Sequence, residues 1–351
     1  KKAEQLKRSR VVPGDLIIAK TGATIGKSGM FPDAFNSGII ASSCMKISCD
    51  TNFVDPKLIL YMIVWEEGQK KILEGAGGST RTSINIGPFS NIQLYLPESK
   101  SEQRKIAEIL TTVDDAIEQT EALIRKYQRI KQGLMQDLLT RGVDENGKVR
   151  SFTKNRFIIT KLGLIPENWT ISSIGKLFSL GRGRVISEEY IKQNPGPYPV
   201  YSSQSMNGGT LGFISTYDFD GEYITWTTDG AYAGTVFFRS GKFNCTNVCG
   251  TLKMNKPEYS VKFFSYLIAT YTKKYVSYVG NPKLMNNIVD KIEIAYPVDP
   301  EEQNKIRSYI EFIEEVLFTE INYCHKLKKI KQGLMQDLLT GKVRVNALLE
   351  Q

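Results

Sequence analysis

An identical internal repeat constrains the fold of this chain more than any other feature of its sequence. Residues 130–140 read Ile-Lys-Gln-Gly-Leu-Met-Gln-Asp-Leu-Leu-Thr and recur without change at 330–340, a shift of 200 residues. The match extends upstream at the same shift, where Glu102-Gln103 corresponds to Glu302-Gln303, and it fades before about residue 97. Such a repeat indicates two copies of one structural unit. Each copy has a variable globular part followed by a well-matched tail.

The matched tails have the heptad spacing of a coiled coil, with seam positions that alternate steps of four and three residues. Helix-start signals precede both tails, at Ser99 and at Asp299. A single helix of this kind leaves its apolar seam exposed, so we expect the two tails to pair as an antiparallel coiled coil. The seam positions are Ile106, Leu110, Val113, Ile117, Thr120, Ile124 and Tyr127 in the first tail and Ile306, Ile310, Ile313, Leu317, Glu320, Cys324 and Leu327 in the second.

The globular parts read as mixed and strand-rich. Residues 16–18, 92–96 and 223–226 are short β-branched or aromatic runs bounded by glycine and proline, which predicts strands. Residues 56–68 and 260–271 have helical patterns at corresponding places in the two copies. The predicted fold class is therefore α+β, with two strand-rich domains separated by a pair of long helices and related by an internal pseudo-two-fold repeat.

This organisation predicts six segments. Nothing in the first copy matches residues 162–207, so we expect the first globular domain to be incomplete at its N-terminal side. The predicted segments are a first domain at 1–98, a first long helix at 99–141, a linker at 142–161, a second domain at 162–298, a second long helix at 299–341 and a tail at 342–351.

Charge and hydropathy favour a cytoplasmic chain with a polyanionic partner. The sequence has 46 Lys+Arg against 37 Asp+Glu, a net charge of +9, which suits nucleic acid. No apolar run approaches the roughly 20 residues that a membrane span needs, and the first residues do not form a signal peptide. We therefore expect no membrane partner.

Catalytic and metal-binding residue patterns are missing from the sequence. His325 is the single histidine, which excludes the two-histidine zinc-peptidase motif. Cys245 and Cys249 lack the four-ligand spacing of a zinc site, so buried free thiols are the better interpretation. We expect no metal, no cofactor and no enzymatic activity of the chain alone.

Residues 22–28 resemble a phosphate-binding P-loop but are one residue too short. The corresponding residues 230–236 contain neither the lysine nor the serine of such a loop. A glycine-shaped turn between strands is therefore favoured at both places. A nucleotide-binding enzyme remains an alternative that only this defective motif supports.

The identity of the two tails includes positions that point away from the seam. Packing alone constrains the seam and leaves the surface free to diverge, so an identical surface indicates that the same partner binds twice, about a pseudo-two-fold axis. Recent duplication is the alternative, although it would have left the globular parts alike too. The candidate partner-binding residues are Lys131, Gln132, Leu134, Gln136 and Asp137 in the first tail and Lys331, Gln332, Leu334, Gln336 and Asp337 in the second.

The globular parts carry basic, amide and hydroxyl side chains on glycine-rich loops, which suits contact with DNA. Arginine pairs with guanine and glutamine or asparagine with adenine, whereas lysine more often meets phosphate. Gln204 and Arg184 are the preferred base readers and Lys283 the preferred phosphate contact; a solvated loop is an equal alternative for any one residue. The candidates are Lys20, Thr21, Arg81, Thr82, Arg182, Arg184, Tyr201, Ser203, Gln204, Asn207, Thr227, Asn281 and Lys283.

The layout resembles the specificity (S) subunit of type I restriction–modification systems. The resemblance rests on the repeated tails, on Gly341-Lys342-Val343-Arg344, on Leu164-Ile165-Pro166-Glu167-Asn168-Trp169, and on Gly14-Asp15-Leu16-Ile17 with the following Thr-Gly-Ala-Thr-Ile-Gly turn.

The resemblance implies two target-recognition domains that each read half of a split sequence in double-stranded DNA, with two helices fixing the spacer between the halves. It further implies recruitment of two copies of an adenine-methylating M subunit and, through them, of the restriction (R) subunit. The S subunit itself would be non-catalytic. A coiled-coil scaffold that binds DNA without sequence specificity is the alternative outside this family.

Overall fold

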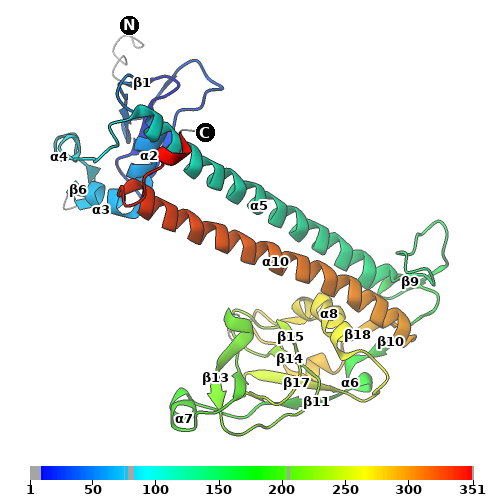
Figure 1. The fold of residues 1–351 in the computed structure, drawn as a ribbon. Coiled ribbons are helices and arrows are strands. Elements are labelled where there is room, and N and C mark those ends of the chain that lie inside the picture. The colour runs from blue at the N-terminus through cyan, green and yellow to red at the C-terminus, as the bar shows by residue number, and fades with distance from the viewer. Residues whose placement is uncertain (1–8, 75, 78–82, 204–205, 350–351) are drawn as a thin grey trace. The chain divides into compact units, whose positions relative to one another are not determined.

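The computed structural model describes residues 9–74, 76–77, 83–203 and 206–349. The chain divides into two compact units (Figure 1). Unit 1 comprises residues 1–125 and 318–351, and unit 2 comprises residues 126–317. Each unit contains one globular part and a portion of both long helices, so each is described by itself.

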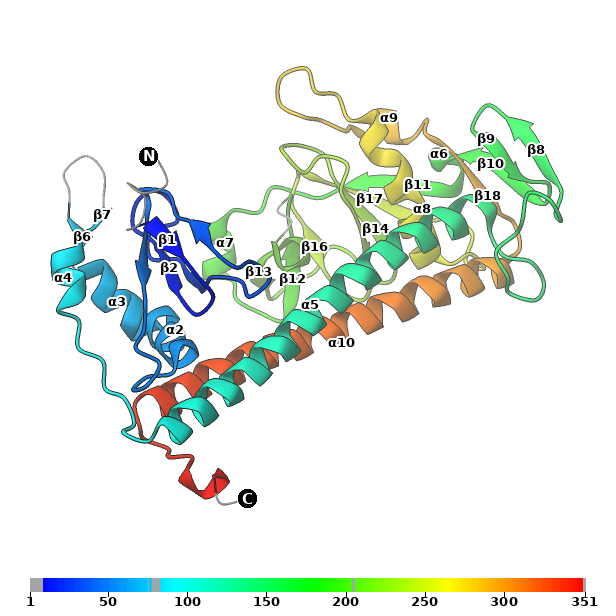
Figure 2. The ribbon, with the colours of Figure 1, turned by 90° about the horizontal axis from the view of Figure 1, so that it is seen from above.

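Unit 2 is built on a four-stranded antiparallel sheet in the order β11-β17-β14-β15. Helix α8 packs on this sheet (Figure 2). It contributes Phe263, Phe264, Leu267 and Ile268 to the buried core. The sheet strands and its helix are β11 (Phe178–Arg182), β14 (Tyr223–Thr227), β15 (Val236–Arg239), β17 (Cys249–Met254) and α8 (Val261–Thr272).

Smaller sheets and short helices surround this sheet in unit 2. Strand β10 pairs antiparallel with β18, β12 pairs with both β13 and β16, and β8 pairs with β9. These elements are β8 (Phe157–Thr160), β9 (Gly163–Pro166), β10 (Trp169–Ser173), α6 (Ile174–Leu177), α7 (Glu188–Gln193), β12 (Tyr198–Tyr201), η2 (Met206–Gly209), β13 (Thr210–Ile214), β16 (Asn244–Cys245), η3 (Lys273–Tyr275), α9 (Asn286–Val289) and β18 (Glu293–Pro297).

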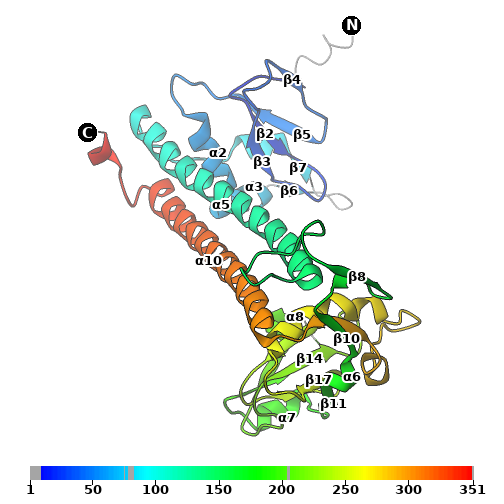
Figure 3. The same cartoon turned by 90° about the vertical axis from the view of Figure 1, so that its right-hand side faces the viewer.

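Unit 1 repeats the centre of this arrangement with fewer strands. Its sheet has the order β3-β2-β5, and helix α2 packs against it as α8 does in unit 2 (Figure 3). The elements are β1 (Arg10–Val11), β2 (Leu16–Ala19), β3 (Ser28–Met30), β4 (Gly38–Ile39), β5 (Cys44–Ile47), α2 (Pro56–Val64), α3 (Glu66–Glu74), β6 (Ala76–Gly77), β7 (Ser83–Ile84), α4 (Ile86–Ser90) and, after the second long helix, η4 (Asn346–Leu348).

The two long helices confirm the coiled-coil prediction. They are α5 (Lys100–Arg141) and α10 (Pro300–Leu339). In unit 1, Lys331 pairs with Asp114 at 2.6 Å and Lys328 with Glu121 at 2.6 Å. In unit 2, Lys131 of α5 pairs with Glu314 of α10 at 2.7 Å. Residue numbers fall along α10 as they rise along α5, so the helices pack antiparallel.

The predicted seam lies inside this helix pair. Ile106 and Leu110 are buried in unit 1, and Ile306, Ile310 and Ile313 are buried in unit 2. The helix starts are also where the caps predicted them. Ser99 accepts a hydrogen bond from the Glu102 amide, and Asp299 accepts one from the Glu301 amide. The Glu102 carboxylate does not complete a capping box, because it is used in another contact described below.

Two of the three predicted strands are confirmed, as β2 and β14, and both predicted helices are confirmed, as α2 and α8. The third prediction, a strand at residues 92–96, is wrong. Its counterpart β18 pairs with β10, whereas no described residue of unit 1 pairs with residues 92–96. A β-prone run forms a strand only where a second strand supplies its hydrogen bonds.

The segment that resembles a P-loop is a turn, as the repeat predicted. Residues 20–27 connect β2 to β3, and their counterparts connect β14 to β15. Gly22 and Gly26 have φ of 88° and 82°, and Gly230 and Gly234 have φ of 91° and 79°. Left-handed backbone at both ends of each turn accounts for the repeated glycines. A phosphate-binding role is not needed to explain them.

Candidate nucleic-acid and partner interfaces

Two loops that are far apart in the sequence meet at the end of the unit 2 sheet. The Leu284 amide donates to the Thr228 carbonyl at 2.9 Å, and the Gly230 amide donates to the Pro282 carbonyl at 3.0 Å. The Trp226 indole also donates a hydrogen bond to the Leu284 carbonyl. The fold therefore holds residues 227–234 and 276–284 together as one loop pair.

The same loop pair recurs in unit 1. The Ile84 amide donates to the Lys20 carbonyl at 2.8 Å, which matches the bond between Leu284 and Thr228. Thr21 and Ser83 form an isolated antiparallel β-bridge. The predicted contacts Lys20 and Thr21 thus lie beside the segment that follows residue 82. The predicted residues Arg81 and Thr82 lie outside the described residues.

The Asp229 carboxylate pairs with two residues of unit 2 that are predicted to contact DNA. Its carboxylate lies 3.5 Å from Arg182 and 3.8 Å from Lys283, and it accepts a hydrogen bond from Thr228. Arg182 also donates to the Asn247 carbonyl at 2.6 Å. Lys283 and the predicted Asn281 are exposed. The loop pair therefore presents fixed polar groups at its surface.

Arg184 is held beside the sheet by Asp218. Its Nε donates to the carboxylate at 2.8 Å, and its guanidinium lies 5.4 Å from the centre of the Tyr190 ring. The prediction that Thr227 is an exposed hydroxyl is wrong. Thr227 is 1% exposed, because it ends β14, a strand that is paired on both edges and buried on both faces.

The predicted contact Tyr201 lies against Arg239, a buried arginine that the sequence pattern did not single out. The Arg239 guanidinium lies 3.5 Å from the centre of the Tyr201 ring and donates to the Gly208 carbonyl at 2.8 Å. Burial lowers the pKa of Arg239. Asn207 is exposed and has a positive φ of 49°. Arg239 therefore contacts the residue at the end of β12 and the residue that follows Asn207. The predicted Gln204 lies outside the described residues.

The two tails present matching surfaces. Gln132 and Gln136 are exposed in the first tail, and Gln332 and Gln336 are exposed in the second. The other predicted partner residues make internal contacts: Leu134 and Leu334 pack against apolar cores, Lys131 and Lys331 bridge to the facing helix, Asp137 pairs with Arg141, and Asp337 pairs with Lys342.

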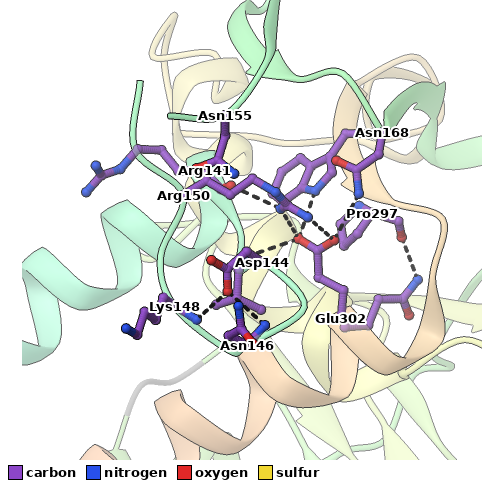
Figure 4. A network of polar contacts seen from close by, with 12 residues as sticks. Arg141, Asp144, Asn146, Lys148, Arg150, Asn155, Asn168, Pro297 and Glu302 are labelled. Carbon is purple, nitrogen blue, oxygen red and sulfur yellow. Dashed lines mark hydrogen bonds and ion pairs between the residues drawn. The ribbon is translucent and has the colours of Figure 1, made fainter. Parts of the chain in front are cut away.

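A buried carboxylate at the start of α10 accepts hydrogen bonds from several side chains. Glu302 accepts two hydrogen bonds from Arg150, at 2.5 and 2.9 Å. The indole of Trp169 donates to it at 3.1 Å and the amide of Asn168 at 3.3 Å (Figure 4). The side chains of Glu302 and Arg150 are only 5% and 11% exposed. We call this ion pair and its counterpart in unit 1 the clasp.

The counterpart joins Glu102 to Arg344. The two guanidinium bonds measure 2.6 and 2.7 Å. Arg150 and Arg344 each end the sequence Gly-Lys-Val-Arg, which occurs at 147–150 and at 341–344. This recurrence, displaced by six inserted residues, is the signal that could have revealed the clasp. Each arginine follows one helix and binds the glutamate at the start of the other.

The neighbouring glutamines anchor the globular parts. Gln303 accepts a hydrogen bond from the amide of Ser260, which caps α8, and donates to the Pro297 carbonyl. Gln103 accepts one from the amide of Asp55, which caps α2, and donates to the Pro97 carbonyl. The glutamine at each helix start therefore binds the globular part that precedes the helix. The glutamate at the same helix start binds the segment that follows the other long helix.

Comparison with known proteins shows which family this chain belongs to. Residues 1–127 and 166–332 match the family described as "Type I restriction modification DNA specificity domain". The chain belongs to this family. A specificity subunit is the non-catalytic part of such a system, so the family carries DNA recognition rather than an enzyme activity.

Curated relatives of this specificity subunit occur in Mycoplasma pneumoniae. A putative type I specificity subunit is 45% identical over 242 residues, which is 69% of this chain and 86% of the relative. Another is 50% identical over 124 residues, 35% of this chain and 66% of the relative. The first three relatives are matched over 39% to 66% of their own lengths.

A solved structure shows the same fold. The specificity subunit from M. genitalium has a TM-score of 0.66 and 18% identity, and the match covers 93% of this chain and 83% of that one. Within the described residues of this specificity subunit, no cluster of three potential metal-binding side chains occurs. No helix among those residues is long and apolar enough to cross a membrane.

Acid is expected to loosen the clasp of unit 1. Hydrogen bonds from Arg344 hold the pKa of Glu102 below the ordinary glutamate value of 4.5. Because the folded pKa lies below the unfolded one, the stabilisation is complete above the unfolded pKa and is lost as pH falls through the folded value. Amide hydrogen exchange of residues 100–110, followed from pH 7 down to about pH 3, should show this loss.

The matched variants are Arg344→Met and Lys342→Met. Arg344→Met leaves Glu102 buried without its cation, so protonation then relieves an unpaired charge, and acid should no longer weaken protection. Lys342→Met changes an exposed neighbour and should keep the wild-type acid response. The same acid response in Arg344→Met and in the wild type would contradict the role of the clasp.

Proposed function

We propose that this chain reads a bipartite sequence in double-stranded DNA, with one half-site read by each globular part. Residues 1–98 and 162–298 would be the two target-recognition domains, and 99–141 and 299–341 the helices between them. The carrying observation is that the two copies share a fold and are identical at 130–140 and 330–340, whereas their loops differ. Identical surfaces suit one partner bound twice, whereas diverged loops suit two different targets. Work on chromosomal DNA would place the chain in the cytoplasm.

Co-expression with an adenine methyltransferase (M) subunit tests this function. Mapping of methylated adenines should return one motif with two defined halves and an unread spacer. DNA binding without any sequence preference in the presence of the M subunit would favour the non-specific coiled-coil scaffold instead. Nucleotide hydrolysis by the pure chain would favour an enzyme, although the P-loop-like segment is a turn in both copies.

The tails would recruit two M subunits and, through them, the restriction (R) subunit. Support comes from Gly133 and Gly333, which lie inside α5 and α10, near the C-terminal end of each helix. A Cβ placed on either glycine would meet nothing within 4 Å. Glycine in a helix interior costs about 1 kcal/mol relative to alanine. The fold of this chain gains nothing from these glycines, so close approach of a partner to bare backbone explains them best.

The double variant Gly133→Ala/Gly333→Ala tests this interface. Alanine should stabilise each helix by up to about 1 kcal/mol, while the two methyl groups should obstruct the M subunit and weaken the complex at least tenfold. Thermal unfolding and analytical size exclusion with the M subunit measure the two effects. The control Lys126→Ala/Lys326→Ala alters exposed positions just before the repeat. A complex of wild-type affinity in the glycine variant would remove this surface from the interface.

The loop pair would supply DNA contacts in each domain. Lys283→Ala should weaken binding to all sequences alike and reduce the salt dependence by about one counterion. Arg184→Ala should instead lose discrimination at one base pair, by about 1–3 kcal/mol. Competition binding by the complex with cognate and scrambled DNA separates these effects. Lys154→Ala, at an exposed position in the linker, is the control. Equal losses on both DNAs for Arg184→Ala would exclude it as a base reader.

The helices would act as the ruler between the half-sites. One heptad inserted after Gln119 and one after Thr319 preserves the seam and adds about 10 Å at 1.5 Å per residue. That length corresponds to roughly three base pairs at about 3.4 Å each. Methylation mapping should show unchanged half-sites and a longer spacer, shortened somewhat if groove rotation must be accommodated. An unchanged spacer would argue against the ruler.

A further inference from the structure

A tyrosine of α2 fixes the position of this helix beside the long helices in unit 1. The Tyr61 hydroxyl donates a hydrogen bond to the Asp114 carboxylate of α5 at 2.9 Å. Lys331 of α10 pairs with the same carboxylate at 2.6 Å. The three side chains come from three helices, so α2 lies beside the repeated segment of α10 (Figure 1).

Unit 2 uses the same contact. The Tyr266 hydroxyl of α8 donates a hydrogen bond to the Glu314 carboxylate of α10 at 2.6 Å. Lys131 of α5 pairs with that carboxylate at 2.7 Å. Each tail therefore has a domain helix at the same place beside it. Counted from the two tyrosines, position 65 of the first domain corresponds to position 270 of the second.

The residues at these two positions differ. Trp65 ends α2 and packs against the buried cluster that contains Met335. Thr270 is a small, exposed residue of α8. Met335 is 7% exposed, whereas its counterpart Met135 is only half-buried. Because residues 130–140 and 330–340 are identical, the two tails present the same residues beside different neighbours.

A groove lies between Trp65 and the second tail. It has a volume of about 300 Å³, and its lining includes Trp65, Glu66, Gln332, Met335 and Gln336. Gln332 and Gln336 are the exposed residues of the predicted partner surface on this tail. A partner that covers these two glutamines therefore also covers the groove.

The groups that line the groove leave specific bonds to be made. Lys328 and Lys331 also line it, but both are already paired with acidic residues of α5. Among the described residues, the Trp65 indole N–H and the Glu66 carboxylate have no hydrogen-bond or ion-pair partner. Trp65 and Met335 supply apolar surface. The groove therefore fits an apolar side chain that is accompanied by a hydrogen-bond acceptor and a cation.

We propose that the groove beside Trp65 is an additional binding site for the M subunit on the second tail, so that the two M subunits bind unequally. This inference rests on the proposed recruitment of M by both tails. The M subunit on the second tail inserts an apolar side chain against Trp65, whereas the one on the first tail meets Thr270. Tryptophan is enriched among the residues that dominate binding free energies. The second tail is therefore occupied first.

Titration of the full chain with the isolated M subunit, followed by native mass spectrometry, tests the proposal. The wild type should bind two M subunits with dissociation constants that differ at least tenfold, once the statistical factor for two equal sites is removed. Hydrogen exchange of the one-to-one complex should show new protection at residues 60–66 and 328–336, and none at residues 128–136.

Matched variants test the source of the difference. Trp65→Thr gives the first domain the residue type of the second, and it should weaken the first step at least tenfold and make the two sites equal. Thermal unfolding measures whether this variant remains folded. Phe35→Thr removes an exposed aromatic side chain from a loop of the same unit and should leave both steps unchanged. Gly333→Ala should also narrow the difference between the steps, whereas Gly133→Ala should widen it.

The outcomes separate this inference from the recruitment itself. Two equal steps in the wild type, protection of both tails at one equivalent of M, or unequal steps that persist in a folded Trp65→Thr variant would overturn the additional site. In each of these cases both M subunits still bind. Failure of the M subunit to bind either tail would instead overturn the proposed recruitment.

Discussion

The arrangement of each unit depends on a buried carboxylate that is paired with a guanidinium from the other copy of the repeat. In unit 2 both side chains are buried, so removal of either partner would leave the other charge without compensation, at a cost of about 3–5 kcal/mol for such pairs. In unit 1 only Glu102 is buried, so the loss of Arg344 is the damaging change there. The bidentate geometry also fixes direction, because both N–H groups of the arginine fork must face both carboxylate oxygens. The clasp therefore sets where each tail ends relative to the start of the opposite helix.

The glutamine beside each glutamate completes this joint. Its amide oxygen accepts from the capping residue of the domain helix, and its amide nitrogen donates to the strand-end carbonyl. Both glutamines are at most 2% exposed. Two consecutive polar side chains thus connect three parts of each unit: the domain, the long helix and the returning tail. This explains why Glu-Gln survives in both copies where the surrounding sequence diverges.

Local periodicity made the helices, their antiparallel pairing and their starting points predictable. The heptad at Ile106, Leu110 and Val113 needs no knowledge of distant residues. The clasp could not be predicted in the same way, because Glu102 and Arg344 lie 242 positions apart. Residues 92–96 have strand propensity, yet their state depends on a partner strand. Thr227 is a hydroxyl residue beside a glycine-containing turn, as expected of a loop contact, but it ends a strand that is buried on both faces.

The loop pairs were predictable only in part. Candidates such as Lys20 and Lys283 were recognised by residue type near glycines, and the structure places them on loops that meet in each unit. The role of Arg239 was not predictable, because in the sequence it is an ordinary residue of a strand. Its contact with Tyr201 depends on how two sheets meet, and no local pattern encodes that.

The duplicated joint has a consequence for how such a chain can change over generations. Because both joints use the same bonds, a domain that keeps its capping residue and strand-end carbonyl fits either position. Substitutions in the loops leave these groups untouched, and substitutions in the joints affect them at once. Variation should therefore accumulate at the loop pairs while Glu-Gln and Gly-Lys-Val-Arg persist, and whole globular parts could be exchanged without any change in the helices.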